Sequence, residues 1–187
     1  MTSGKDIATD LLRRLLAGER GQVGLHLSML LEKAYPVAAS DETYRQILPP
    51  ELADIHLSAE TAKEITALIC TEISRNPRES LISAVSFTGA EVATKTAANV
   101  LANPPRPLTM GEYASALSIV GKYLPGELSE QPEFLPKAEL ERLIQVAKQL
   151  KNVAETGTVA ERSARITAKH HAAGLLESLR SRGIIEN

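Results

Sequence analysis

The sequence contains few aromatic residues. Phe, Tyr and Trp together make up 3% of the chain, with two Phe and no Trp. A core must therefore be built from Leu, Ile, Val and Ala, which suits closely packed helices better than a β-sandwich. The same scarcity removes the usual material of stacking sites and of interface hot spots.

Cysteine and long apolar runs are also scarce. The single Cys70 excludes an intramolecular disulfide and fits a reducing compartment. No run of about 18 apolar residues is present, so we expect no membrane span. The N-terminal residues 1–6 lead into a mixed amphipathic pattern and not into a continuous apolar signal segment. The expected location is the cytoplasm.

The charge is nearly balanced, with a formal net charge of −2 in 187 residues. No bulk field therefore draws the protein to nucleic acid or to an anionic membrane. The length suits one domain, residues 1–187. Within it we distinguish an N-terminal helical hairpin with a connector, residues 1–57, and a main helical core, residues 58–187.

Apolar residues recur at helical spacing along the chain, and no strand-like alternation is present. Helix starts are marked by the capping boxes of Thr109 with Glu112 and of Thr158 with Glu161, and by a cap at Ser58. We predict an all-α fold, a compact array of about seven to eight short helices that are antiparallel or stacked. In architecture this resembles HEAT and armadillo helical pairs, although no repeat consensus is matched.

Two internal helix starts are predicted from the same kind of pattern. Asn76 is a candidate N-cap, with Pro77 at the first helical position. Thr88 is a second candidate, and its apolar neighbours Phe87 and Val92 are placed to form a hydrophobic staple. The Thr88 pattern favours two helices within residues 79–102 over one continuous helix.

The glycines of segment 18–24 precede a helix N-terminus, where backbone N–H groups could hold an anion. The segment lacks the Lys-Ser/Thr of a phosphate-binding loop, so a plain interhelical turn is favoured. Ser80, Ser83 and Ser86 are not set in a Gly-x-Ser-x-Gly elbow and are interpreted as small packing or exposed polar residues. The adjacent pair His170-His171 points about 100° apart and cannot bind one metal from one helix face. We expect no catalytic residue, cofactor or metal site.

A basic stripe of Arg162, Arg165 and Lys169 is the sharpest hint of nucleic-acid binding. Glu161 and Glu177 dilute its charge, and phosphate binding requires a concentrated positive field. Basic side chains that lay their apolar stems over the helix explain the same residues. Nucleic acid is therefore an unfavoured partner that stays open.

The segment 126–135 carries Leu128, Phe134 and Leu135 in an otherwise acidic stretch. It is predicted to be a loop after Pro125, too long for a tight helix–helix turn. These apolar residues are our candidate interaction surface, on the hypothesis that they are exposed anchors for a partner or a second copy. The alternative is that the loop packs against its own core.

The predicted function is a non-catalytic helical interaction or scaffold module that binds another protein or itself. One alternative is a nucleic-acid-associated regulator that uses the basic C-terminal helix. Another is an enzyme with a site between helices around a histidine. Cys70 follows the apolar stripe of its helix, and we predict that it is buried.

Overall fold

The computed structural model describes residues 3–19, 22–35 and 41–186, which form ten α-helices and no strand. The predicted all-α fold is confirmed. The helices are α1 (Gly4–Leu16), α2 (Val23–Glu32), α3 (Asp41–Ile47), α4 (Pro50–Ala53), α5 (Ala59–Arg75), α6 (Glu79–Ala84), α7 (Glu91–Ala102), α8 (Met110–Glu130), α9 (Lys137–Lys151) and α10 (Val159–Ser181). The short helices α3 and α4 lie in the expected connector and raise the number above seven or eight. The likeness to HEAT or armadillo pairs stays a prediction.

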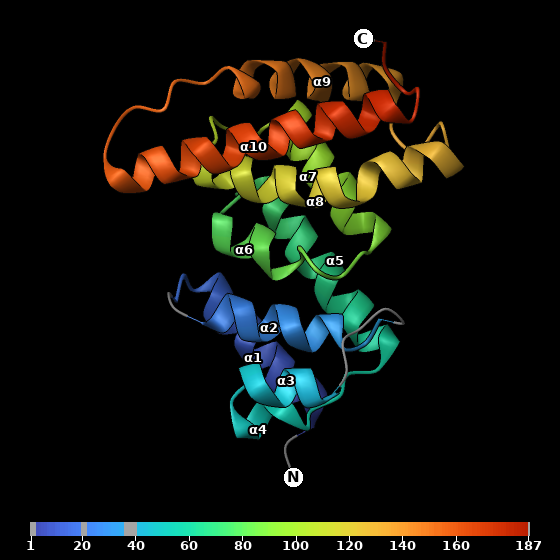
Figure 1. The fold of residues 1–187 in the computed structure, drawn as a ribbon. Coiled ribbons are helices and arrows are strands. Elements are labelled where there is room, and N and C mark those ends of the chain that lie inside the picture. Colours follow the sequence, from blue (N-terminus) through green and yellow to red (C-terminus); the bar gives the residue numbers. More distant parts are fainter. Residues whose placement is uncertain (1–2, 20–21, 36–40, 187) are drawn as a thin grey trace.

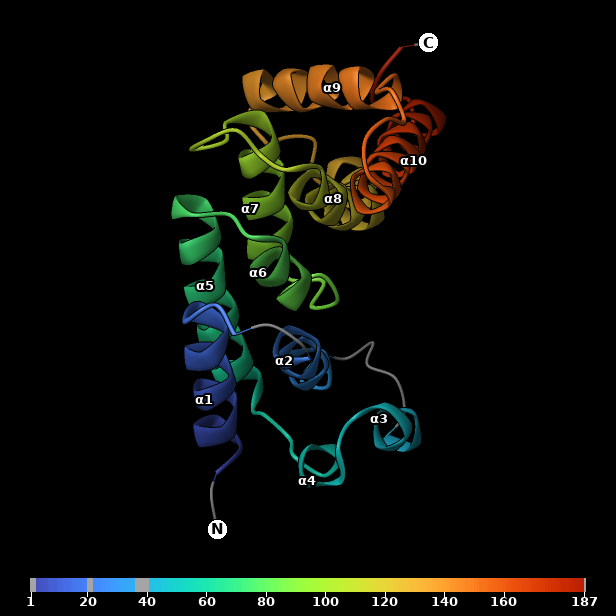
Figure 2. The ribbon, with the colours of Figure 1, turned by 90° about the vertical axis from the view of Figure 1, so that its left-hand side faces the viewer.

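The helices are stacked from one end of the molecule to the other (Figures 1 and 2). Helices α1–α4 form one end and α8–α10 the other, with α5–α7 between them. Helix α1 packs on α2 and α5, α2 packs on α6, and α10 packs on α8 and α9. Their buried apolar side chains form one core cluster, composed mainly of Leu, Ile, Val and Ala. None of the described helices is both long enough and apolar enough to cross a membrane.

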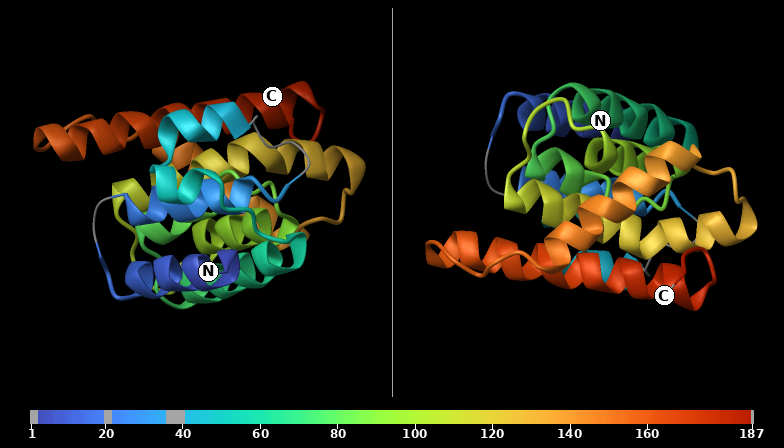
Figure 3. Two further views of the ribbon diagram at one scale, coloured as in Figure 1. Left: turned by 90° about the horizontal axis from the view of Figure 1, so that it is seen from below. Right: turned by 90° about the horizontal axis from the view of Figure 1, so that it is seen from above.

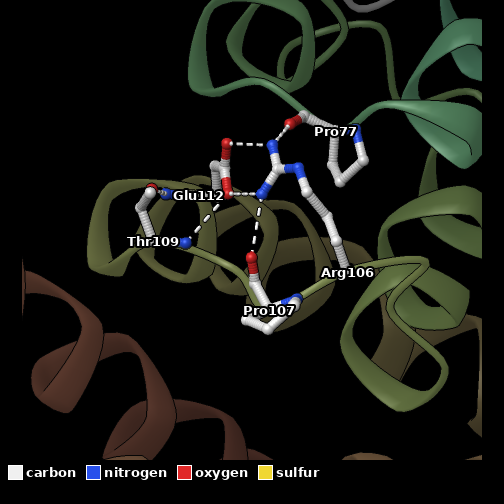
Figure 4. Close-up of polar contacts among 5 residues, drawn as sticks. All are labelled: Pro77, Arg106, Pro107, Thr109 and Glu112. Carbon is white, nitrogen blue, oxygen red and sulfur yellow. Dashed lines mark hydrogen bonds and ion pairs between the residues drawn. The ribbon is translucent and has the colours of Figure 1, made fainter.

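The two predicted capping boxes are confirmed. The Thr109 hydroxyl accepts the Glu112 N–H at 3.2 Å, and the Glu112 carboxylate accepts the Thr109 N–H at 2.9 Å (Figure 4). Thr158 and Glu161 make the same reciprocal pair at 3.3 and 2.8 Å. Ser58 caps α5 as expected. These boxes satisfy backbone N–H groups that have no partner inside a helix.

The predicted helix start at Asn76 is wrong, because Asn76 is the C-cap of α5 and α6 begins only at Glu79. Asn103 ends α7 in nearly the same conformation, with φ −142° and ψ 63° against −146° and 77° at Asn76. Each Asn precedes a proline, whose ring disfavours the helical region for the preceding residue. The Asn-Pro pairs therefore end helices in this chain.

Residues 79–102 form two helices as predicted, but the predicted cap does not separate them. Thr88 is buried and lies before the turn, while the N-cap of α7 is Ala90. Gly89 makes the break with φ 58°, a left-handed conformation that glycine adopts without steric cost. Phe87 and Val92 are exposed, and with the N-cap at Ala90 they do not occupy the positions that the expected staple requires.

Helix α8 continues through Pro125 to Glu130, so the predicted loop from residue 126 is wrong. A proline inside a helix loses one backbone hydrogen bond, which usually ends the helix. Here Leu124 and Leu128 lie one turn apart on either side of Pro125, and all three are buried. Burial of this apolar face offsets the lost hydrogen bond. The loop before α9 is shortened accordingly.

Candidate functional site

The predicted interaction surface is not exposed. Leu128, Phe134 and Leu135 are each 4% exposed and belong to the core cluster. The Lys95 ammonium lies 4.8 Å from the centre of the Phe134 ring and covers it further. The expectation of exposed anchors is therefore corrected, and the alternative holds. These side chains are apolar because the end of α8 and the segment between α8 and α9 pack on the core.

The basic stripe is partly occupied by contacts within the chain. The Lys169 ammonium pairs with the Glu155 carboxylate at 2.7 Å. An Nη1 hydrogen of Arg165 is donated to the Ala154 carbonyl at 3.3 Å. Both partners belong to the α9–α10 loop, while Arg162 is exposed. Two of the three basic side chains thus hold a loop, and their charge is not gathered into one field.

A large concave surface lies between the α1–α2 hairpin and α6, with a volume of about 870 Å³. A second hollow of about 480 Å³ adjoins it and shares Ser86 and Phe87. A third, of about 510 Å³ between α8 and α10, shares Ser118 and His171 with the second. We call these three adjoining hollows the α6 groove. Figure 2 shows α6 between the hairpin and the α8–α10 layer.

Small residues form most of the groove's wall. Ser80 and Ser83 of α6 line the first hollow, with Ser86 just beyond the helix. Ser115 and Ser118 of α8 line the third hollow, facing small residues of α10. The three α6-region serines are therefore wall residues of a groove. Short side chains leave room in which another chain can approach the helices closely.

Charged groups of both signs also line the groove. Arg78 donates an Nη2 hydrogen to the Leu16 carbonyl at 3.1 Å, and its Nε is buried without a hydrogen-bond partner. No carboxylate of the described residues forms an ion pair with Arg78. Lys122 lies with its ammonium 5.2 Å from the centre of the Phe87 ring. The aromatic face at the junction of the first two hollows is thus partly shielded by a cation.

The glycine-containing turn borders the first hollow. Gly18 has φ 84°, and both Gly18 and Gly24 line the wall. Gly21 lies outside the described residues. The positive charge that faces this hollow comes from the Arg78 side chain, while Glu19 of the turn contributes a carboxylate.

His170 and His171 both line the second hollow, and His171 also lines the third. Burial lowers the pKa of His171, and the neighbouring His170 lowers it further. In the part of the chain that the structure describes, no hydrogen bond joins His171 to a serine or a carboxylate. A base that activates a nucleophile needs such a contact. The same described ranges contain no group of three or more His, Cys, Asp or Glu side chains that could hold a metal ion.

Comparison of the chain with protein-family models, with curated proteins and with solved structures finds no match.

Proposed function

We propose that the chain is a non-catalytic helical interaction module that binds a segment of another protein in the α6 groove. The observation that carries the proposal is the groove itself, which extends from the α1–α2 hairpin to α10. Short side chains form most of its walls. An extended peptide segment fits such a shape better than a compact ligand does.

The hydroxyl groups of the groove support a peptide occupant. Ser86 and Ser118 donate to backbone carbonyls of Ser83 and Ser115, at 2.7 and 2.8 Å. Each hydroxyl oxygen keeps lone pairs that can accept a hydrogen bond. A peptide backbone presents N–H groups at regular intervals, and a row of acceptors along the groove would meet them.

An apolar rim supports the proposal independently. Phe87 is 46% exposed and Leu25 is 41% exposed, and both line the first hollow. Of the two Phe residues in the chain, Phe87 is the exposed one. Exposed aromatic side chains at the edge of a groove are typical anchors for a partner. Phe87 thus takes the role that the sequence suggested for Phe134.

The N-terminal half of α10 gives the groove a projecting wall. Figures 1 and 3 show it extending beyond the other helices. Val159 and Ile166 are exposed there, at 82% and 45%. Neither residue lines one of the three hollows, so they add exposed apolar surface beside the groove. The cytoplasm, which the single cysteine favours, is the proposed location.

Site-specific photo-crosslinking in cells of the organism that produces the protein tests the proposal. A benzophenone amino acid placed at Phe87 or at Ser118 should cross-link to the same protein, identified by mass spectrometry. The matched control is Leu68 on α5, which is 58% exposed but lies outside the groove. A cross-link to a second copy at positions 87 and 118 would identify that copy as the occupant. Cross-linking at position 68 as strong as at the groove positions would contradict the proposal.

A binding measurement with the purified partner gives the magnitude. Phe87→Ala should weaken binding at least about tenfold, as loss of an interface anchor does. It should leave the melting temperature nearly unchanged, because Phe87 is exposed. Leu68→Ala should change neither quantity. Equal affinities of the two variants would exclude the groove as the interface.

A further inference from the structure

We infer that the first hollow of the α6 groove binds a carboxylate attached to an apolar group, with Arg78 as its charge partner. The inference concerns the ligand's chemistry and holds for a free carboxylic acid as well as for a peptide with a free carboxyl terminus. It does not require that the proposed protein partner exists.

Arg78 is the cation of this hollow. It is the residue immediately before α6, and its Nη2 hydrogen bond to the Leu16 carbonyl at 3.1 Å holds the guanidinium against the end of α1. Its Nε is buried and has no hydrogen-bond partner. Buried N–H groups are nearly always paired, so an unpaired one beside a cavity indicates a missing acceptor. A carboxylate is the acceptor that matches the geometry of a guanidinium best.

Ser28 supplies a second unpaired group in the same wall. It lies in the middle of α2, is 1% exposed, and its hydroxyl has no hydrogen-bond partner. A helical serine commonly donates to a carbonyl one turn earlier, as Ser74 does to the carbonyl of Cys70 at 3.0 Å. Ser28 makes no such bond. It lines the hollow together with Arg78 and can donate to a bound carboxylate.

The other charges of the wall disfavour a dianion more strongly than an anion with a single charge. Glu19 and Glu79 both line the hollow. The Glu19 carboxylate is held by Arg14 through two hydrogen bonds of 2.6 and 2.8 Å, whereas no described residue forms an ion pair with Glu79. One guanidinium beside a second carboxylate leaves little attraction for a phosphate dianion. A carboxylate carries half the charge of the dianion, so the carboxylate of Glu79 repels it less.

The apolar residues of the wall favour a ligand that has an apolar group next to its carboxylate. Leu15, Leu25 and Phe87 face the hollow along with the serines of α6. Its volume of about 870 Å³ is in the range of small-ligand pockets. A short aliphatic or aromatic body would bury its surface against these three side chains. Acetate, which has no such body, should bind far more weakly.

The test follows the Arg78 Nε–H signal in ¹H–¹⁵N spectra of the full chain. Titration with 3-phenylpropionate should shift this signal until it saturates. Neutral 3-phenylpropanamide and inorganic phosphate should leave it in place, and acetate should need at least about tenfold higher concentration. A signal that 3-phenylpropionate does not move, or that the amide moves equally, would overturn the inference.

Variants identify the contacts. Arg78→Gln should weaken 3-phenylpropionate binding at least tenfold and Ser28→Ala several-fold. Arg75→Gln, which changes an exposed arginine at the end of α5, is the matched control and should bind normally. Arg78→Lys keeps the charge and tests the same contact if Arg78→Gln does not fold. Unchanged affinity in a folded Arg78 variant would contradict the assignment.

A final comparison separates the two sources of the carboxylate. A tripeptide ending in phenylalanine is titrated with a free carboxyl terminus and as its amide. Carboxylate-dependent binding of the tripeptide, equal to that of 3-phenylpropionate, supports the site and assigns it to peptide termini. Binding of 3-phenylpropionate alone supports the site and assigns it to small acids. Failure of the cross-linking experiment would leave both results standing, because neither uses the cellular partner.

Discussion

Arg106 holds the buried carboxylate of Glu112 through two hydrogen bonds, at 2.9 and 2.8 Å (Figure 4). The same guanidinium donates to the carbonyls of Pro77 and Pro107. Glu112 also accepts the backbone N–H of Thr109. One arginine thus ties the turn between α5 and α6, the loop before α8 and the first turn of α8 into a single network.

Removal of this arginine should destabilise the fold. Arg106→Ala leaves the Glu112 carboxylate buried without its charge partner, which should lower the free energy of unfolding by about 2–3 kcal/mol. Urea denaturation measures the change. Arg13→Ala, which breaks an exposed ion pair with Asp10, is the control and should have little effect. Equal destabilisation by the two variants would contradict the structural role of Arg106.

The same network predicts that the free energy of unfolding depends on pH. Burial alone would raise the pKa of Glu112, but the hydrogen bonds from Arg106 and Thr109 outweigh it, and the pKa of Glu112 is lowered. Since its pKa is lower in the folded than in the unfolded chain, the stabilisation is present above the unfolded pKa of about 4.3 and is lost as the pH falls below it. Unfolding free energies between about pH 6 and pH 3 should therefore fall more steeply in the wild type than in Glu112→Gln. Parallel profiles would contradict this assignment.

Phe134 is predicted to act as a core residue. Phe134→Ala should lower the free energy of unfolding by about 3 kcal/mol, because it removes a large buried side chain. Thermal or urea denaturation measures the loss. Phe87→Ala is the matched control from the surface, and its stability should stay close to that of the wild type. The reverse order of the two effects would show that the burial of these rings is misassigned.

Replacement of Thr66 by valine should stabilise the protein. Its side chain is fully buried, and its hydroxyl has no hydrogen-bond partner. Thr66→Val removes an unsatisfied polar group at nearly constant shape and should raise the free energy of unfolding by about 1 kcal/mol. Thr88→Val is the control, since Thr88 is equally buried but donates to the Val85 carbonyl at 3.0 Å. That variant should be destabilised, and stabilisation of both would refute the explanation.

Cys70 should react slowly in the folded chain. Its predicted burial is confirmed, and burial raises the pKa of the thiol to about 11. Little thiolate is present at pH 8, and reagents can reach the sulfur only after local opening. Labelling with Ellman's reagent should be at least about tenfold slower than in urea-unfolded protein. Equal rates would show that α5 opens freely at this position.

Local hydrogen bonds explain which helix boundaries could be predicted. The boxes at Thr109 and Thr158 join residues three positions apart, so the sequence contains both partners. The Asn-Pro pair at Asn76 also has a local cause, but the sequence pattern is shared by helix starts and helix ends. A proline usually ends a helix, but buried leucines on both sides of Pro125 stabilise the helix, and α8 continues through it.

The candidate site could not be predicted in the same way. Nothing in the sequence around Phe87 or Phe134 shows which ring is buried, because packing with distant residues decides that Phe87 is exposed and Phe134 is not. Arg78 immediately precedes α6 and Ser28 lies in α2, and nothing in the sequence shows that they line one hollow. The orphaned hydroxyl of Ser28 is a property of the folded chain alone. The serines of α6 could be noted in the sequence, but the residues that lie across the hollow from them could not.

The packing of α1 on α5 and of α2 on α6 sets the order in which the chain can complete its fold during synthesis. The α1–α2 hairpin is synthesised before α5 and α6, the helices that pack on it, which lie within residues 59–84. Until those residues emerge, core side chains of the hairpin such as Leu27 and Leu30 lack part of the surface that buries them. Helices α7–α10 pack largely on near neighbours in sequence, which favours rapid folding. The chain is therefore most prone to aggregation after the α1–α2 hairpin has been synthesised and before residues 59–84 have emerged.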